Sequence, residues 1–121
     1  MKDMNNRKIK LILTAAVALF VFVMISFTAS AAEKPTFGTF KKNIMWSFDT
    51  ETRVLTISGK GDMPDADYSE YPWIKYYEDD VKTVLIEEGI THIGTSAFQS
   101  MINLKVVEFP DSLESIGEKA F

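Results

Sequence analysis

The sequence contains no cysteine among its 121 residues. This absence excludes a disulfide-stapled scaffold, a zinc site with thiolate ligands, and a lipid anchor attached to a cysteine at a cleavage point. Positive charge is also scarce: from residue 32 onward, nine Lys or Arg face sixteen Asp or Glu. Nucleic-acid binding depends on clustered basic side chains that meet the phosphates. The composition therefore predicts a protein without a nucleic-acid partner.

Residues 1–31 have the pattern of a secretory signal. Basic residues precede an apolar run from Leu11 to Phe27, and the small residues Ala29 and Ala31 follow it. This order of regions predicts a signal peptide over residues 1–31, cleaved after Ala31. The alternative is an uncleaved anchor, since about 17 to 25 apolar residues can span a bilayer. Both interpretations predict a secreted or cell-surface protein that meets the membrane only through this segment.

Residues 81–121 contain two copies of one repeat. Residues 81–98 and 104–121 align without a gap, so every residue of the first copy has its counterpart at one constant offset. A fixed period in the twenties is typical of a solenoid, in which each repeat forms one turn of a coil. Successive side chains of a strand point to opposite faces, so Val84 and Ile86 are expected to point inward and Leu85 outward. Phe98 and Phe121 end the two copies, and we expect them to stack as an apolar spine.

The repeat also carries a recognisable motif. Both copies follow the pattern L-x-x-V-x-[IF] and then [IL]-x-x-I-G-x-x-A-F, with Val81 at the leucine position of the first copy. This pattern resembles the BspA-type bacterial leucine-rich repeat. The resemblance implies a mainly β or α+β fold, namely the start of a leucine-rich-repeat solenoid. It also implies a secreted or surface protein that binds or adheres. Gly94 and Gly117, within the motif, suit either a positive φ or close backbone packing.

Residues 32–80 are interpreted as a leader and an N-terminal cap for the first coil. Two strand-like runs separated by a polar turn predict a hairpin at about residues 44–59. Pro72 then opens a predicted short helix at about residues 72–78. The apolar side chains of these elements are expected to cover the end of the solenoid. Residues 32–40 are interpreted as a loose leader without regular structure.

The other end of the sequence stops in the middle of the repeat motif, at Phe121. We interpret this as truncation of a longer solenoid. The second coil then lacks a neighbour, and its open edge is expected to recruit another chain and to make the fragment self-associate.

Candidate catalytic and metal-binding residues are few. His92, which is the only histidine, takes the position of Ser115 in the second copy and is interpreted as a solvated, outward position. The loop with Asp62, Asp65, Asp67 and Glu70 could offer oxygen ligands to Ca²⁺, but it lacks the glycine and final glutamate of an EF-hand loop. We therefore favour a solvated loop over a calcium site. The sequence predicts no cofactor, no metal and no catalytic activity.

The leading functional hypothesis is an extracellular interaction or adhesion module that binds a protein or a surface polymer. The alternative is a non-catalytic accessory module that targets a larger secreted enzyme to carbohydrate or another substrate. In either case, the outward strand positions of the two coils form the candidate partner-binding surface. These positions are Lys82, Thr83, Leu85, Glu87, Lys105, Val106 and Glu108.

Overall fold

The structure is a computed structural model that describes residues 33–121. The predicted signal peptide, residues 1–31, lies outside the described residues. Residues 34–121 form one compact unit. Within the described part of the chain, no helix is long and apolar enough to cross a membrane.

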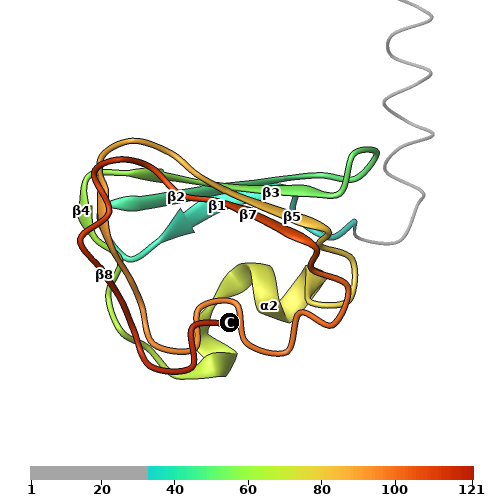
Figure 1. Cartoon of the computed structure of the whole chain (residues 1–121). Coiled ribbons are helices and arrows are strands. Elements are labelled where there is room, and N and C mark those ends of the chain that lie inside the picture. Colours follow the sequence, from blue (N-terminus) through green and yellow to red (C-terminus); the bar gives the residue numbers. More distant parts are fainter. Residues whose placement is uncertain (1–32) are drawn as a thin grey trace, which may run out of the picture. The chain divides into compact units, whose positions relative to one another are not determined.

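Two sheets form the sides of a coiled chain, as seen along the coil in Figure 1. The larger sheet has five strands in the order β1 (Phe37–Phe40), β2 (Ile44–Asp49), β3 (Val54–Gly59), β5 (Thr83–Ile86) and β7 (Val106–Glu108). The smaller sheet has three short strands in the order β4 (Gly61–Asp62), β6 (Ile90–Ile93) and β8 (Ser115–Ile116). The core that the coil encloses is apolar.

The strand pairing confirms the repeat register. β5 and β7 are parallel, and Val84 pairs with Val107, its counterpart in the second copy. β6 and β8 are also parallel, and Ile93 pairs with its counterpart Ile116. Each repeat therefore contributes one strand to each sheet and stacks directly on its neighbour, as expected of a solenoid. The predicted fold class is confirmed.

A further coil precedes the two repeats. β3 lies parallel to β5, with Leu55 paired with Val84, and β4 lies parallel to β6. The second strand of the predicted hairpin is therefore also the first strand of the solenoid, and not only part of a cap. A register shift between Gly61 and Asp62 changes the offset to the next coil. The offset from this coil to the next is 29 or 30 residues, against 23 between the two repeats, so a search for one constant period does not find this coil.

The interpretation of residues 32–40 as a loose leader is wrong for its last four residues. β1 pairs antiparallel with β2 along its whole length. Phe40 is buried, with its ring 4.8 Å from that of Tyr71 and 5.5 Å from that of Trp73. Gly38 interrupts the apolar alternation and conceals the strand, but a Cβ there would lie only 3.0 Å from Trp46 Nε1. A residue without a Cβ lets the Trp46 ring pack beneath β1.

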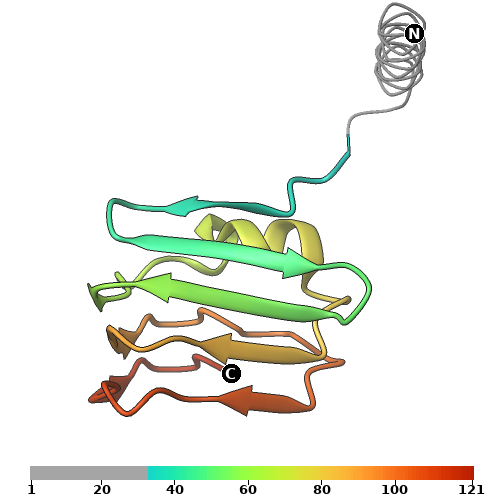
Figure 2. The ribbon, with the colours of Figure 1, turned by 90° about the horizontal axis from the view of Figure 1, so that it is seen from above.

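The short helix packs on the inner side of the five-stranded sheet. A 3-10 turn, η1 (Tyr68–Glu70), leads into α2 (Pro72–Tyr77), where the first position suits proline because its missing N–H needs no partner there. Trp73, Ile74 and Tyr77 are buried. Figure 2 shows α2 at the end of the sheet formed by β1 and β2. The helix thus supplies apolar side chains to the first coil.

An aromatic stack runs through the core from the helix to the last coil. The rings of Trp73 and Phe98 are stacked at 6.0 Å, and those of Phe98 and Phe121 at 5.3 Å. The spine predicted from Phe98 and Phe121 is confirmed, and Trp73 extends it. The indole N–H of Trp73 donates to the Ala97 carbonyl at 2.7 Å, so a buried donor is also satisfied.

Candidate interaction surface

One side of the five-stranded sheet packs on the core, and the other side faces away from it. Alternation along each strand separates the two sets of side chains: in β2, for example, buried and exposed residues alternate from Ile44 to Asp49. We call the outward set the outer face. It consists of Phe37, Thr39, Met45, Ser47, Asp49, Val54, Thr56, Ser58, Thr83, Leu85, Val106 and Glu108.

The register of the strands arranges the outer face in rows that run across the sheet. The longest row takes one residue from each of the five strands: Phe37, Ser47, Thr56, Leu85 and Glu108. Because paired residues on one face of a sheet have their Cβ atoms close together, each member of the row can contact the next. The row changes in character from aromatic, through hydroxyl and aliphatic, to acidic.

The structure places the seven predicted surface residues along β5 and β7. Thr83 is paired with Val106, and Leu85 with Glu108, so these four belong to the outer face and are direct neighbours. Lys82 and Lys105 are exposed immediately before the two strands, and Glu87 is exposed immediately after β5. The role of these residues in binding stays a prediction.

Sequence reasoning missed the larger part of the outer face, which belongs to β1, β2 and β3. Phe37 is 76% exposed and Met45 is 54% exposed, although both are large and apolar. Met45 could have been found, since it lies in a predicted strand between Ile44 and Trp46, whose burial the alternation predicts. Phe37 could not, because β1 itself was not predicted.

Two shallow grooves are lined partly by residues of the outer face. The first is lined by Phe37, Gly38, Thr39, Met45, Trp46, Ser47 and Ser58, and it carries no charged side chain. The second lies between neighbouring coils and is lined by Leu85, Ile86, Glu87, Glu88, Glu108, Phe109 and Pro110. The two grooves therefore offer different chemistry: the first, over β1 and β2, is neutral, and the second, at the C-terminal ends of β5 and β7, is acidic.

Two carboxylates near the outer face are held by backbone N–H groups. Glu88 is not simply solvated, because its carboxylate accepts the backbone N–H groups of Asp111 at 2.7 Å and Ser112 at 3.2 Å in the next coil. At the hairpin end, the backbone N–H of Thr52 and then that of Glu51 lower the pKa of Asp49 by donating to its carboxylate. Asp49 thereby holds the turn between β2 and β3.

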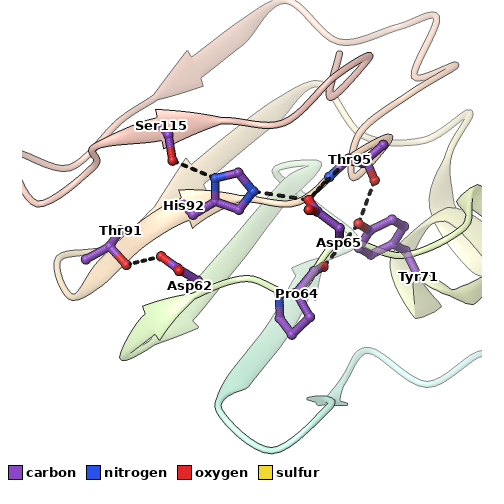
Figure 3. A network of polar contacts seen from close by, with 8 residues as sticks. All are labelled: Asp62, Pro64, Asp65, Tyr71, Thr91, His92, Thr95 and Ser115. Atoms are coloured by element: carbon purple, nitrogen blue, oxygen red, sulfur yellow. Dashed lines mark hydrogen bonds and ion pairs between the residues drawn. The ribbon is translucent and has the colours of Figure 1, made fainter.

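Apart from the outer face, a network of polar side chains beside the three-stranded sheet joins three successive coils (Figure 3). His92 Nε2 is 3.1 Å from Asp65 Oδ1, and His92 Nδ1 is 2.6 Å from Ser115 Oγ. The Asp65 carboxylate also accepts from the backbone N–H of Thr95 at 2.8 Å. We call Asp65, His92 and Ser115 the polar ladder. The interpretation of His92 as a solvated position is wrong, since its side chain is only 21% exposed and bridges two coils.

The polar ladder contains the residue types of a serine hydrolase, but its surroundings favour a structural role. An ionised Asp65 carboxylate accepts a hydrogen bond from the Nε2–H of His92, which leaves Nδ1 to accept a hydrogen bond from the Ser115 hydroxyl. Acyl transfer, however, needs donors that stabilise a developing oxyanion. The neighbouring hollow is instead lined by the carboxylates of Asp65, Asp67 and Glu70. Negative charge would destabilise such a transition state.

The polar ladder gives a first prediction. We expect His92→Ala to lower the free energy of unfolding by about 1–2 kcal/mol, because two hydrogen bonds between coils are lost. Urea denaturation of the two proteins measures the difference. Thr50→Ala, in the exposed hairpin turn, is the control and should fall within about 0.5 kcal/mol of the parent protein. Equal effects of the two substitutions would show that the polar ladder contributes nothing.

The same contacts predict a dependence on pH. The Thr95 backbone N–H, and next the His92 hydrogen bond, hold the pKa of Asp65 below its usual value of 3.8. A group whose pKa is lower in the folded state stabilises the protein above its unfolded-state pKa, and this stabilisation is lost as the pH falls through the folded-state pKa. We therefore expect Asp65→Asn to be less stable at pH 7 and to lose less stability on acidification below about pH 4. Thermal melts from neutral to strongly acidic pH test this, and parallel profiles for the two proteins would contradict it.

The carboxylates of the acidic loop are engaged by neighbouring groups of the protein. Among residues 33–121, no group of three or more His, Asp or Glu side chains is placed to hold a metal ion. Asp62 instead accepts the hydroxyl of Thr91 at 2.6 Å, and Asp65 is engaged in the polar ladder. Asp67 and Glu70 form a capping box at the start of η1. The carboxylates of the loop thus anchor it to the next coil and to its own backbone.

Tyr71 ties the same loop to the core. Its hydroxyl donates to the Thr95 carbonyl at 2.6 Å, at the bend that follows β6. Burial raises the pKa of Tyr71 to about 12, so the group stays a donor throughout the physiological range. This hydrogen bond therefore connects the acidic loop and the start of α2 to the turn that follows β6.

Parallel strands at a constant offset, an aromatic spine and an outer sheet face together define a leucine-rich-repeat solenoid. Residues 74–121 match the family described as "BspA type Leucine rich repeat region (6 copies)", and this part of the chain belongs to the BspA-type leucine-rich repeats. The fold is similar to the crystal structure of a leucine-rich repeat protein from Eubacterium ventriosum ATCC 27560, with a TM-score of 0.65 and 34% sequence identity. That match covers 74% of this chain and 24% of the other, so the chain spans about a quarter of that protein. A comparison with curated proteins gave no match.

Proposed function

We propose that the chain is an extracellular interaction module that binds or adheres to other proteins through the outer face. Leucine-rich repeat domains generally mediate protein–protein binding, and this chain contains such a region. The observation that carries the proposal is the exposure of large apolar residues on one face of the five-stranded sheet. Phe37, Met45 and Val106 are 76%, 54% and 47% exposed. Patches of this kind on soluble proteins commonly mark binding sites.

Secretion is the second part of the proposal, and its support is the pattern of residues 1–31. We expect exported protein to begin at Ala32, because the basic, apolar and small-residue regions are those that a signal peptidase requires. Intact-mass measurement of material from the culture medium or cell surface tests this. Recovery of membrane-embedded protein that retains Met1 would contradict cleavage and support the anchor.

The binding role is tested by separating the outer face from the rest of the surface. The full chain, fixed to beads, is exposed to a panel of purified extracellular proteins. We expect binding to at least one of them to be lost in the double variant Leu85→Glu and Val106→Glu. The control is Lys75→Glu on α2, which is exposed and lies on the opposite side of the sheet. Binding that is insensitive to the outer-face variant, or lost equally in the control, would contradict the proposal.

A further inference from the structure

We infer that the outer face binds a segment of a partner protein that crosses all five strands. This segment would place apolar side chains on Phe37 and Met45 and a basic side chain at Glu108. The inference rests on the proposed function and names the chemistry of its partner. It assigns the strands before the repeats to the binding surface, in addition to their role in covering the core.

The continuity of the sheet is the first step. β1 and β2 are antiparallel and β3, β5 and β7 are parallel, yet all five strands are hydrogen-bonded to their neighbours in one sheet. Figure 2 shows them following one another from β1 to β7. A partner resting on Leu85 and Val106 therefore meets the same surface continued without a break as far as Phe37.

The distribution of apolar groups is the second step. Phe37 and Met45 lie at the β1–β2 end, where they line a groove without charged side chains, and Val106 and the half-buried Leu85 lie at the other end. Between them, Ser47 and Thr56 are paired across β2 and β3 and present hydroxyl groups. The outer face thus offers two apolar contacts separated by a strip that can donate and accept hydrogen bonds.

Charge decides the nature of the occupant. Glu87 and Glu108 are exposed at the C-terminal end of β5 and β7, where they line the second groove with Glu88, whereas Lys82 and Lys105 lie at the opposite end of these strands. From residue 32 onward, sixteen Asp or Glu face nine Lys or Arg. A partner with basic side chains is attracted by this field over a distance and pairs with these carboxylates at contact, whereas an acidic partner is repelled. Among the outer-face residues Phe37 is the single aromatic one, which gives little stacking surface for a sugar. A polypeptide with apolar and basic side chains fits best.

The size of the sheet sets the length of the segment. Neighbouring strands are about 4.8 Å apart, so the four steps from β1 to β7 cover roughly 19 Å. An extended chain advances about 3.3 Å per residue, and a segment of about six residues therefore spans the row from Phe37 to Glu108. The two kinds of contact lie at opposite ends of this row, so a segment must cross the sheet to use both.

A library of random peptides on phage, each about twice the length that the row requires, is selected on the immobilised full chain to test the inference. We expect enriched peptides to combine apolar residues with Lys or Arg. A synthetic peptide made from the consensus should bind at least tenfold more weakly to the double variant Phe37→Ser and Met45→Ser, and also to Glu108→Lys. Binding should weaken as salt is added, because exposed charges are screened. Glu118→Lys, which makes the same charge change at an exposed residue outside the outer face, is the matched control.

Four outcomes would overturn the inference. The first is a set of enriched peptides that is acidic or lacks basic residues. The second is that no peptide is enriched. The third is equal binding of the consensus peptide to all variants. The fourth is binding that survives Phe37→Ser and Met45→Ser but is lost in Leu85→Glu and Val106→Glu. That result would confine binding to the coils and leave the proposed function standing. Circular dichroism of each variant, all of which change exposed or half-exposed residues, checks that folding is retained.

Discussion

Phe98→Ala is expected to lower the free energy of unfolding by about 3–5 kcal/mol, the range for truncation of a buried aromatic side chain. Phe98 is 1% exposed and stacks between Trp73 and Phe121. Removing its ring leaves a cavity in the middle of the spine, and the coils on either side lose their shared contact. Since whole domains are stable by only about 5–15 kcal/mol, the variant should be close to unfolding at room temperature.

Guanidinium or urea denaturation measures this effect, and two other phenylalanines serve as controls. Phe121→Ala should cost about half as much, because Phe121 occupies the equivalent position but is 47% exposed. Phe37→Ala, at 76% exposure, should change the stability by no more than about 0.5 kcal/mol. If the three substitutions had equal effects, the aromatic spine would not be the core of the solenoid.

Gly94→Ala is the second substitution with a large expected effect, and the informative result is whether it raises or lowers the free energy of unfolding. Gly94 does not have a positive φ, so alanine would ordinarily be tolerated or would stabilise the fold by restricting the unfolded chain. However, a Cβ at this position would lie 2.5 Å from the Pro64 carbonyl oxygen and 2.6 Å from the Tyr71 hydroxyl. The backbone of the preceding coil must then move, and we expect a loss of about 2–3 kcal/mol.

Gly38→Ala is the matched control for this steric effect. It also lacks a positive φ, but its Cβ would first meet the Trp46 side chain, at 3.0 Å. A side chain yields more easily than backbone, so the loss should be smaller than at Gly94. Thermal melts of both variants give the comparison. An unchanged or raised melting temperature for Gly94→Ala would show that the coils are less tightly stacked at this turn than the structure indicates.

The positions of Phe98 and Gly94 also show what could be predicted from the sequence. The repeat was predictable because Gly94 and Phe98 recur as Gly117 and Phe121 in an unbroken motif. Periodicity reveals which residues share an environment, and the inward and outward alternation of β5 and β7 followed from it. For Gly94, the motif left open a positive φ or close packing, and the structure decides for close packing.

Other features could not be predicted, because they depend on contacts between unlike segments. The polar ladder joins Asp65, His92 and Ser115, and Asp65 lies in a coil that does not repeat the motif. Nothing in the local pattern around His92 distinguishes a bridging side chain from a solvated one. The coil formed by β3 and β4 was hidden because it also contains η1 and α2, so that Leu55 pairs with Val84 at an offset of 29 residues instead of the 23 of the repeats.

The shared strand β3 has a consequence for the order in which the chain folds. β2 and β3 are joined by a short turn that Asp49 holds, whereas the pairing of β3 with β5, as at Thr56 and Leu85, must close a much longer loop that includes α2. Closing a short loop costs less conformational entropy, so the β2–β3 hairpin is expected to form before any parallel pair. Its free edge then presents backbone donors and acceptors in register to β5, and β5 presents them to β7. The hairpin acts as a template, and the register of each later coil is set by its pairing with the coil that precedes it in the chain.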